Sequence, residues 1–227
     1  MKKKFRVMII LISVIVVFLA SGYTDKSLGA EDILFRAQKQ INSLHDCSYT
    51  IHTIYYATDE IQEADYEVMF KEPDMFLCVA TLSDKQNKSV RLLDGEFMWT
   101  YIPDTNIVTK TLISNTSESI QNDYVNMINI FINNSVSIKL VGEEDIGDRP
   151  AYLLEGLMAE KSDSSEQGAR AMVWIDQDTW MLSRYEVYNL DGELSMELEI
   201  HDLEINTGIS DSEFDFDVPT GARLLEI

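Results

Sequence analysis

An alternation of apolar and polar residues near the end of the chain most constrains its fold. Leu194, Met196, Leu198 and Ile200 alternate with Glu or Ser at positions 193, 195, 197 and 199. Successive side chains of a β-strand point to opposite faces of the sheet, so this segment has one apolar face and one largely acidic face. An Asp-Gly dipeptide, which is a strong signal for a tight hairpin turn, precedes it. The alternation therefore predicts an antiparallel sheet with one buried face.

Short segments with the same period of two recur along most of the chain. The connections between them are too short for the crossovers that parallel strands need, so consecutive antiparallel strands are expected. These strands are predicted at 48–58, 61–71, 74–82, 88–93, 97–102, 107–112, 135–141, 150–157, 170–176, 181–189 and 193–205. Two other segments, 31–44 and 120–132, have the helical spacing of apolar residues and are predicted to be amphipathic helices.

About eleven strands and two helices predict a mainly β protein of the α+β type. A sheet of this size must curl or close to shield its apolar face. We therefore expect one large, curved antiparallel sheet that forms an incomplete barrel, with the helices covering its concave side. The chain is 45% hydrophobic, which separates it from disordered proteins. With no long linker in the sequence, residues 31–227 are predicted to form a single domain.

The N-terminus has the layout of an export signal. Four basic residues lie within the first six positions and precede an apolar run from Val7 to Ala20. That run is shorter than the roughly 20 residues of a spanning helix. Residues 1–22 are thus expected to be an export signal or an uncleaved N-terminal anchor, and 23–30 a short linker. The stretch 19–23 is similar to a lipobox, but Tyr23 stands where the lipidated cysteine would be, which excludes lipidation there.

The charge excludes one class of partner. The chain has 18 Lys and Arg against 39 Asp and Glu, a net charge of −21. Without residues 1–22 it keeps 14 basic residues against the same 39 acids, a net charge of −25. Proteins bind nucleic acid through clustered Lys and Arg, so no nucleic acid partner is expected.

Motifs for catalysis and metal binding are absent from the sequence. It has no H-E-x-x-H, C-x-x-C, G-x-S-x-G or Gly-rich phosphate loop, and its three histidines lie in separate segments. The acidic cluster at 143–145 is interpreted as a turn, and the one at 211–217 as an extended segment with an exposed acidic face and a buried Phe face. We predict no enzyme activity, no metal and no cofactor. A hydrolase with dispersed carboxylates such as Asp176 and Glu199 is the remaining catalytic alternative.

Two sets of sulfur-containing residues admit two interpretations each. Cys47 and Cys78 are either a disulfide, which an oxidising compartment permits, or two small residues of the core. Eight methionines outside the predicted export signal either fill gaps in the core or line an adaptable cavity. The sequence alone leaves both pairs of alternatives open.

Several local strings resemble the LolA/LolB-type lipoprotein carrier and lipoprotein-sorting superfamily. They are the Phe-Lys-Glu-Pro-Asp-Met-Phe string at 70–76, the D-G-x-x-x-W-x-Y-x-P pattern at 94–103, and Trp-Ile-Asp at 174–176 followed by Ser-Arg-Tyr-Glu at 183–186. The spacing of Asn206, Phe214, Phe216 and Pro219 is similar to the superfamily's closing pattern. The resemblance covers nearly the whole predicted domain.

The resemblance implies an incomplete barrel around an apolar cavity that holds acyl chains. The expected function is an extracytoplasmic, non-enzymatic carrier or acceptor whose partners are lipid or lipidated protein. The alternative is an envelope sensor or interaction module of the same fold that contacts a membrane partner protein.

Candidate residues for the cavity come from the amphipathic strands and the second helix. Phe97, Trp99 and Tyr101 share one strand face, and Met98 lies on the other. A shift of one residue exchanges the two faces, so both are retained. The candidates are Phe97, Met98, Trp99, Tyr101, Met127, Phe131, Met196 and Leu198.

Overall fold

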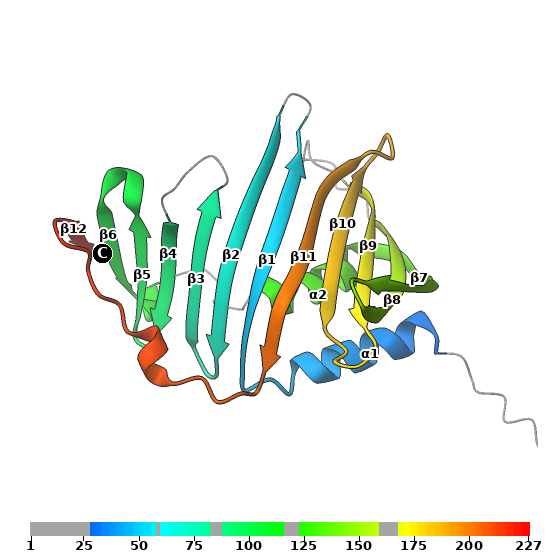
Figure 1. The fold of residues 1–227 in the computed structure, drawn as a ribbon, viewed down its shortest axis with the longest axis horizontal. Helices are drawn as coiled ribbons and strands as arrows, with labels where there is room; N and C mark the ends of the chain where they lie inside the picture. The colour runs from blue at the N-terminus through cyan, green and yellow to red at the C-terminus, as the bar shows by residue number, and fades with distance from the viewer. Residues whose placement is uncertain (1–27, 58–59, 83–87, 116–122, 159–167) are drawn as a thin grey trace, which may run out of the picture.

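The computed structural model describes residues 28–57, 60–82, 88–115, 123–158 and 168–227 (Figure 1). The predicted export signal or anchor at 1–22 lies outside these residues, as does most of the predicted linker. In chain order the elements are α1 (Ala30–Ile41), β1 (Asp46–Tyr56), β2 (Ile61–Lys71), β3 (Met75–Leu82), β4 (Lys88–Asp94), β5 (Phe97–Ile102), η1 (Pro103–Thr105), β6 (Ile107–Leu112), η2 (Ile113–Asn115), α2 (Asp123–Asn134), β7 (Ser135–Ile146), β8 (Arg149–Met158), β9 (Gly168–Asp176), β10 (Leu182–Asn189), β11 (Leu194–Ile205), η3 (Asp211–Phe214) and β12 (Arg223–Glu226).

The strands form one open sheet in the order β12-β6-β5-β4-β3-β2-β1-β11-β10-β9-β8-β7. Neighbouring strands are antiparallel, except that β12 runs parallel to β6. Figure 1 shows the sheet as a broad curved surface, with α1 near the β9–β11 end and the C-terminal segment returning along the opposite end. The predicted fold class, a mainly β protein with a large curved sheet and two helices, is confirmed.

The two faces of the sheet have different environments. The face that packs against the helices, called the inner face below, is apolar, and the opposite one is called the outer face. Side chains at alternate positions of the strands form a core with α1 on the inner face. Its strand members include Tyr49, Val68, Phe76, Leu93, Leu154, Val173, Tyr185 and Leu198.

Helix α1 places its apolar stripe on this core. Ile33, Leu34, Ala37 and Ile41 are buried, as the helical spacing predicts. The helix ends at Ile41 and not at the predicted residue 44, but Leu44 is also buried. The hydrophobic effect therefore fixes α1 across the inner face.

Helix α2 packs against the inner face through a close contact with β8. Phe131 is completely buried, and a Cβ atom added to Gly156 would lie 2.5 Å from its ring. Only glycine allows this approach, because real Cβ atoms do not come so close to a neighbouring carbon. The predicted start of this helix, at 120–122, lies outside the described residues.

Two segments differ from the sequence predictions because of pairing that local patterns do not encode. The predicted turn at 143–145 is part of β7, where these residues pair with 150–152 of β8 beyond an irregularity between Leu140 and Gly142. The short strand β12 was not predicted, since its parallel pairing with β6 joins positions more than 100 residues apart.

The acidic segment 211–217 is not extended throughout. It begins with the 3₁₀ turn η3, which Ser210 caps by accepting a hydrogen bond from the Ser212 N–H. The prediction of a buried Phe face holds for Phe214, which is 1% exposed, whereas Phe216 is half-buried. The C-terminal segment thus bends at η3, beside β3 and β4, before it reaches β6.

Cys47 and Cys78 are not joined by a disulfide, which was one of the two interpretations of the sequence. They lie on β1 and β3, and β2 separates these strands. Two strand spacings amount to about 10 Å, whereas a disulfide requires Cα atoms within about 7 Å. Both cysteines pack into the apolar core of the inner face, which is the second of the two interpretations.

Candidate functional site

The inner face contains an apolar groove between β11, β1, β2, β3 and α2. We call it the main groove; its volume is about 210 Å³. It is lined by Tyr49, Ile51, Thr53, Tyr55, Tyr66, Val68, Phe76, Cys78, Met127, Met196 and Leu198. None of these side chains carries a charge at neutral pH.

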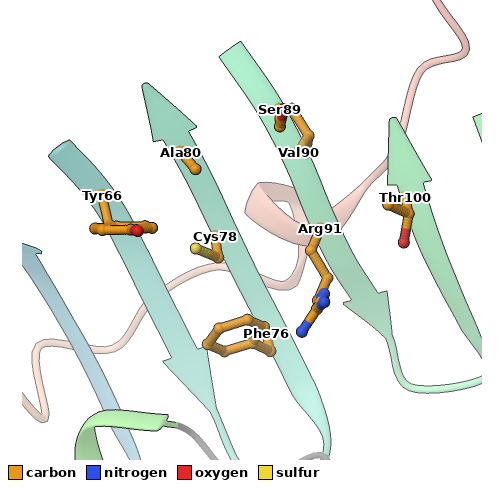
Figure 2. A pocket seen from close by; sticks show the side chains of 8 residues that line it. All are labelled: Tyr66, Phe76, Cys78, Ala80, Ser89, Val90, Arg91 and Thr100. Carbon is orange, nitrogen blue, oxygen red and sulfur yellow. The ribbon is translucent and has the colours of Figure 1, made fainter. Parts of the chain in front are cut away.

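A second hollow adjoins the main groove on the side of β4 and β5. We call it the side hollow; its volume is about 250 Å³. It shares Tyr66, Phe76 and Cys78 with the main groove, so the two form one continuous depression. Figure 2 shows its lining side chains, which are Tyr66, Phe76, Cys78, Ala80, Ser89, Val90, Arg91 and Thr100.

Tyr66 lies where the two depressions meet. Burial raises the pKa of its hydroxyl to about 12, and a side-chain hydrogen bond with Tyr55 acts in the same direction. The phenol is therefore neutral at physiological pH. The junction offers one polar hydroxyl on an otherwise apolar surface.

Five of the predicted cavity residues lie on the inner side of the molecule. Met127, Met196 and Leu198 line the main groove. Met98 packs against the same core from β5, and Phe131 lies wholly within it. The structure thus brings together residues from the second helix and from strands far apart in the sequence.

The other three candidates, Phe97, Trp99 and Tyr101, lie on the outer face. Met98 pairs with the core residue Leu93, and the alternation of β5 directs its neighbours away from the groove. The aromatic side chains are instead close to the C-terminal segment. The Trp99 indole stacks on Phe216, with ring centroids 5.2 Å apart.

A carboxylate and an ammonium group fix this outer aromatic cluster. Asp94 accepts hydrogen bonds from the indole Nε1 of Trp99, at 2.8 Å, and from the backbone N–H groups of Glu96 and Phe97. Burial opposes ionisation of Asp94, but these bonds and nearby Lys110 outweigh it and lower its pKa. The Lys110 ammonium lies 3.7 Å from the Phe97 ring centroid.

Several groove residues on β1, β2 and β3 were not among the residues predicted from the sequence. Tyr66, Val68 and Phe76 line the groove although none was a candidate. The alternation of Tyr66, Val68 and Phe70 was a usable signal for one face of β2. Only the pairing of β2 with β1 and β3 shows that this face is the inner one.

The two carboxylates considered for catalysis are not neighbours. Asp176 ends β9 and Glu199 lies within β11, with β10 between these strands. Asp176 is 2% exposed and accepts hydrogen bonds from the Thr179 N–H and hydroxyl, each at 2.7 Å. Its carboxylate also pairs with Arg149 at 2.8 Å. These contacts stabilise the turn after β9.

Glu199 belongs to an ionic cluster on the outer face. Arg184 lies at the centre of this cluster, 2.7 Å from Glu186 and from Glu197 and 3.9 Å from Glu199. Within the described ranges, no group of three or more His, Cys, Asp or Glu residues has a geometry that could hold a metal ion. In the part of the chain that the structure describes, no helix is long and apolar enough to cross a bilayer.

Comparison with protein families and curated sequences gives one match. Residues 71–215 match a family model described as “-like: Uncharacterized protein”. No curated protein sequence matches the chain.

Solved structures share the fold at low sequence identity. An uncharacterized conserved protein from Thermus thermophilus is 14% identical with a TM-score of 0.58, and the match covers 87% of this chain and 99% of that one. The lipoprotein LppX of Mycobacterium tuberculosis is 16% identical with a TM-score of 0.51, covering 80% and 98%. The predicted resemblance to the LolA-type superfamily is confirmed for the fold.

A third match is a protein solved together with a partner. MucB of Pseudomonas aeruginosa, in complex with MucA, is 12% identical with a TM-score of 0.50. The match covers 82% of this chain but 60% of MucB, so this chain corresponds to about three fifths of that protein.

Proposed function

We propose that this chain, which belongs to the family described as “-like: Uncharacterized protein”, is an exported, non-enzymatic carrier or acceptor. It buries lipid acyl chains, free or attached to a protein, in the main groove. Export through residues 1–22 is part of this proposal. The single domain at 31–227 is the part that binds.

One observation carries the proposal: the sheet exposes an uncharged, apolar groove on its inner face in a protein of net charge −21. The strands that line the groove place their acids on the other face, as with Glu197 and Glu199 beside the inward Leu198. Proteins seldom leave an apolar depression open to water without a ligand for it.

The energetics favour an acyl chain as that ligand. Each methylene group transferred from water to an apolar surface contributes about 0.8 kcal/mol, so a chain of ten or more carbons supplies substantial affinity without polar contacts. Met127 and Met196 line the groove from a helix and a strand, and their flexible side chains can adapt to chains of different length.

A test compares two tryptophan substitutions on one strand. Cys78→Trp adds an indole to the surface shared by the main groove and the side hollow, whereas Val79→Trp adds it to the outer face one residue away. The proposal predicts that native mass spectrometry detects lipid bound to the wild type and to Val79→Trp, and much less on Cys78→Trp.

Two further results make this test decisive. Thermal unfolding shows whether Cys78→Trp is folded. If Cys78→Trp is not folded, Ala80→Trp, which fills the side hollow, replaces it in the comparison. Wild-type protein that carries no lipid and takes up none from vesicles would overturn the proposal.

A second candidate function rests on the match to MucB in complex with MucA. In this alternative the chain is an interaction module that contacts a membrane partner protein, with or without a lipid in its groove. Crosslinking in intact cells that recovers a specific partner, with no lipid transfer between vesicles, would favour it over the carrier.

A further inference from the structure

Two tyrosines on neighbouring strands meet over the main groove. Tyr55 of β1 and Tyr66 of β2 both line it, and the hydroxyl of Tyr66 interacts with that of Tyr55. Tyr66 pairs with Ile51, which precedes Tyr55 by four residues on β1, so the two tyrosines lie on a diagonal across both strands. We call Tyr55 and Tyr66 the tyrosine bridge.

The tyrosine bridge spans a buried pair of residues. Thr53 and Ala64 are register partners midway along the diagonal, and they are 3% and 2% exposed. Side chains that meet across this diagonal must extend over Thr53 and Ala64, which contributes to the burial of that pair. The two hydroxyl groups are therefore held together above the sheet, on its inner face.

The tyrosine bridge lies between a buried part of the groove and an open part. Val68 and Phe76 line the buried part and are 5% and 8% exposed, whereas Tyr55 is 42% exposed. Figure 2 shows Tyr66 and Phe76 at successive levels of the wall that the main groove shares with the side hollow. An amphiphile buries its hydrocarbon and leaves its head group in water. Its chain would therefore extend toward Val68 and Phe76, and its head group toward Tyr55.

The hydroxyl groups of the tyrosine bridge can donate to a ligand. Each phenol has one hydrogen to donate, so a contact between two phenols leaves one hydrogen for another acceptor. The carbonyl oxygen of an acyl chain is such an acceptor, and its burial in an apolar groove is unfavourable unless a donor is present. The bridge lies where a buried chain passes into its head group, and there it supplies the donor that an acyl group requires.

We propose that the tyrosine bridge binds the carbonyl oxygen of an acyl chain and so fixes how far the chain enters the main groove. The ligand is then an acyl ester or an acyl amide, in preference to an alkyl ether or a hydrocarbon. This inference rests on the proposed acyl-binding function, and it adds the polar contact that positions the chain.

The test uses three neutral probes of matched chain length: methyl decanoate, N-methyldecanamide and decyl methyl ether. The ester differs from the ether in one group, a carbonyl in place of a methylene. Isothermal titration calorimetry gives the dissociation constants, and two ratios are compared: the ether constant divided by the ester constant, and by the amide constant. Transfer of the probes from water is the same for every variant, so a change in a ratio reports the contact with the carbonyl. The two ratios separate an ester ligand from an amide ligand.

Removal of the hydroxyl groups locates the contact. Tyr55→Phe/Tyr66→Phe, called the bridge variant, keeps both rings and is expected to lower at least one ratio about fivefold, which is the effect of one hydrogen bond. Its affinity for the ether should change by less than about twofold. Each single substitution leaves one hydroxyl in place and should give a smaller decrease.

Tyr56→Phe/Tyr188→Phe is the matched control. It also removes two tyrosine hydroxyls, but these donate to Glu197 and Glu186 on the outer face. Both ratios should stay within about twofold of the wild type. Thermal unfolding shows whether each double variant is folded, and Tyr66→Phe alone replaces the bridge variant if that variant is not folded.

The outcomes distinguish the two proposals. Unchanged ratios in a folded variant that lacks the bridge, or an equal decrease in the control, would overturn this inference and leave the acyl-binding groove intact. Failure of all three probes to bind would reject the groove as an acyl site, and this inference with it.

Discussion

The indole of Trp99 and the ring of Phe216 are stacked at a centroid distance of 5.2 Å with 21° between their planes. This contact joins β5 to the C-terminal segment on the outer face, opposite the groove. Trp99 therefore anchors the C-terminal segment to the sheet, and other residues line the groove.

Phe216→Ala is expected to lower the free energy of unfolding by about 2 kcal/mol, because it removes a half-buried ring and an aromatic pair. Denaturant titration measures this loss. Acyl affinity of the folded variant should stay within about twofold of the wild type, since the ring lies outside the groove. A variant of full stability that no longer binds acyl chains would instead assign the ligand site to the outer face.

Asp94→Asn tests the carboxylate beneath this cluster. Asparagine keeps an acceptor for the backbone N–H groups but cannot accept fully from the Trp99 indole, so a loss of about 1 kcal/mol is expected at pH 7.

The pH dependence of that loss has a definite sign. The pKa of Asp94 is lowered in the folded state from 3.8, so its stabilising effect is fully present above pH 3.8 and disappears as the pH falls through the folded value. The difference in stability between wild type and Asp94→Asn should shrink below about pH 4. A constant difference down to about pH 2 would contradict the assignment.

Gly156→Ala is expected to destabilise the protein by about 2 kcal/mol, since the new methyl group would overlap the Phe131 ring and Ser135 unless α2 moves. Gly142→Ala on β7 is the matched control, because nothing lies within 4 Å of the added Cβ. Thermal unfolding of both variants gives the comparison. Equal melting temperatures would show that α2 does not pack on β8 as described.

Asp176→Ala should lower stability by about 3 kcal/mol, because it leaves Arg149 and the turn donors without their buried carboxylate. Asp178→Ala, in the same turn but exposed, should change stability by less than about 0.5 kcal/mol. Urea denaturation at pH 7 measures both. Full stability of Asp176→Ala, together with loss of a measurable hydrolase activity, would revive the catalytic alternative.

Most of the fold follows from local pattern. Period-two segments located eleven strands, and Ile33, Leu34 and Ala37 located the stripe of α1, because burial of one face leaves a direct mark on the sequence. Strand β12 and the continuation of β7 past Gly142 escaped prediction. Both depend on partners far away in the chain or across an irregular register, and a few residues of edge strand have no periodicity strong enough to detect.

The site was less predictable than the fold. The pattern of β5 identifies two faces but does not say which one is inner, so Met98 and Trp99 were equally good candidates. The inner face of β5 is identified by the pairing of Met98 with the core residue Leu93, and its outer face by the stacking of Trp99 on Phe216.

Photocrosslinking with an acyl chain shows directly whether the main groove binds lipid. Dodecanoate carrying a terminal diazirine is bound to the wild-type protein and irradiated, and labelled peptides are mapped by mass spectrometry. Labels are expected on groove residues such as Tyr66, Met127 and Met196, and an excess of unmodified dodecanoate should suppress them. Labels confined to Phe97, Trp99 or Tyr101 on the outer face, or no saturable label at all, would contradict the proposed function.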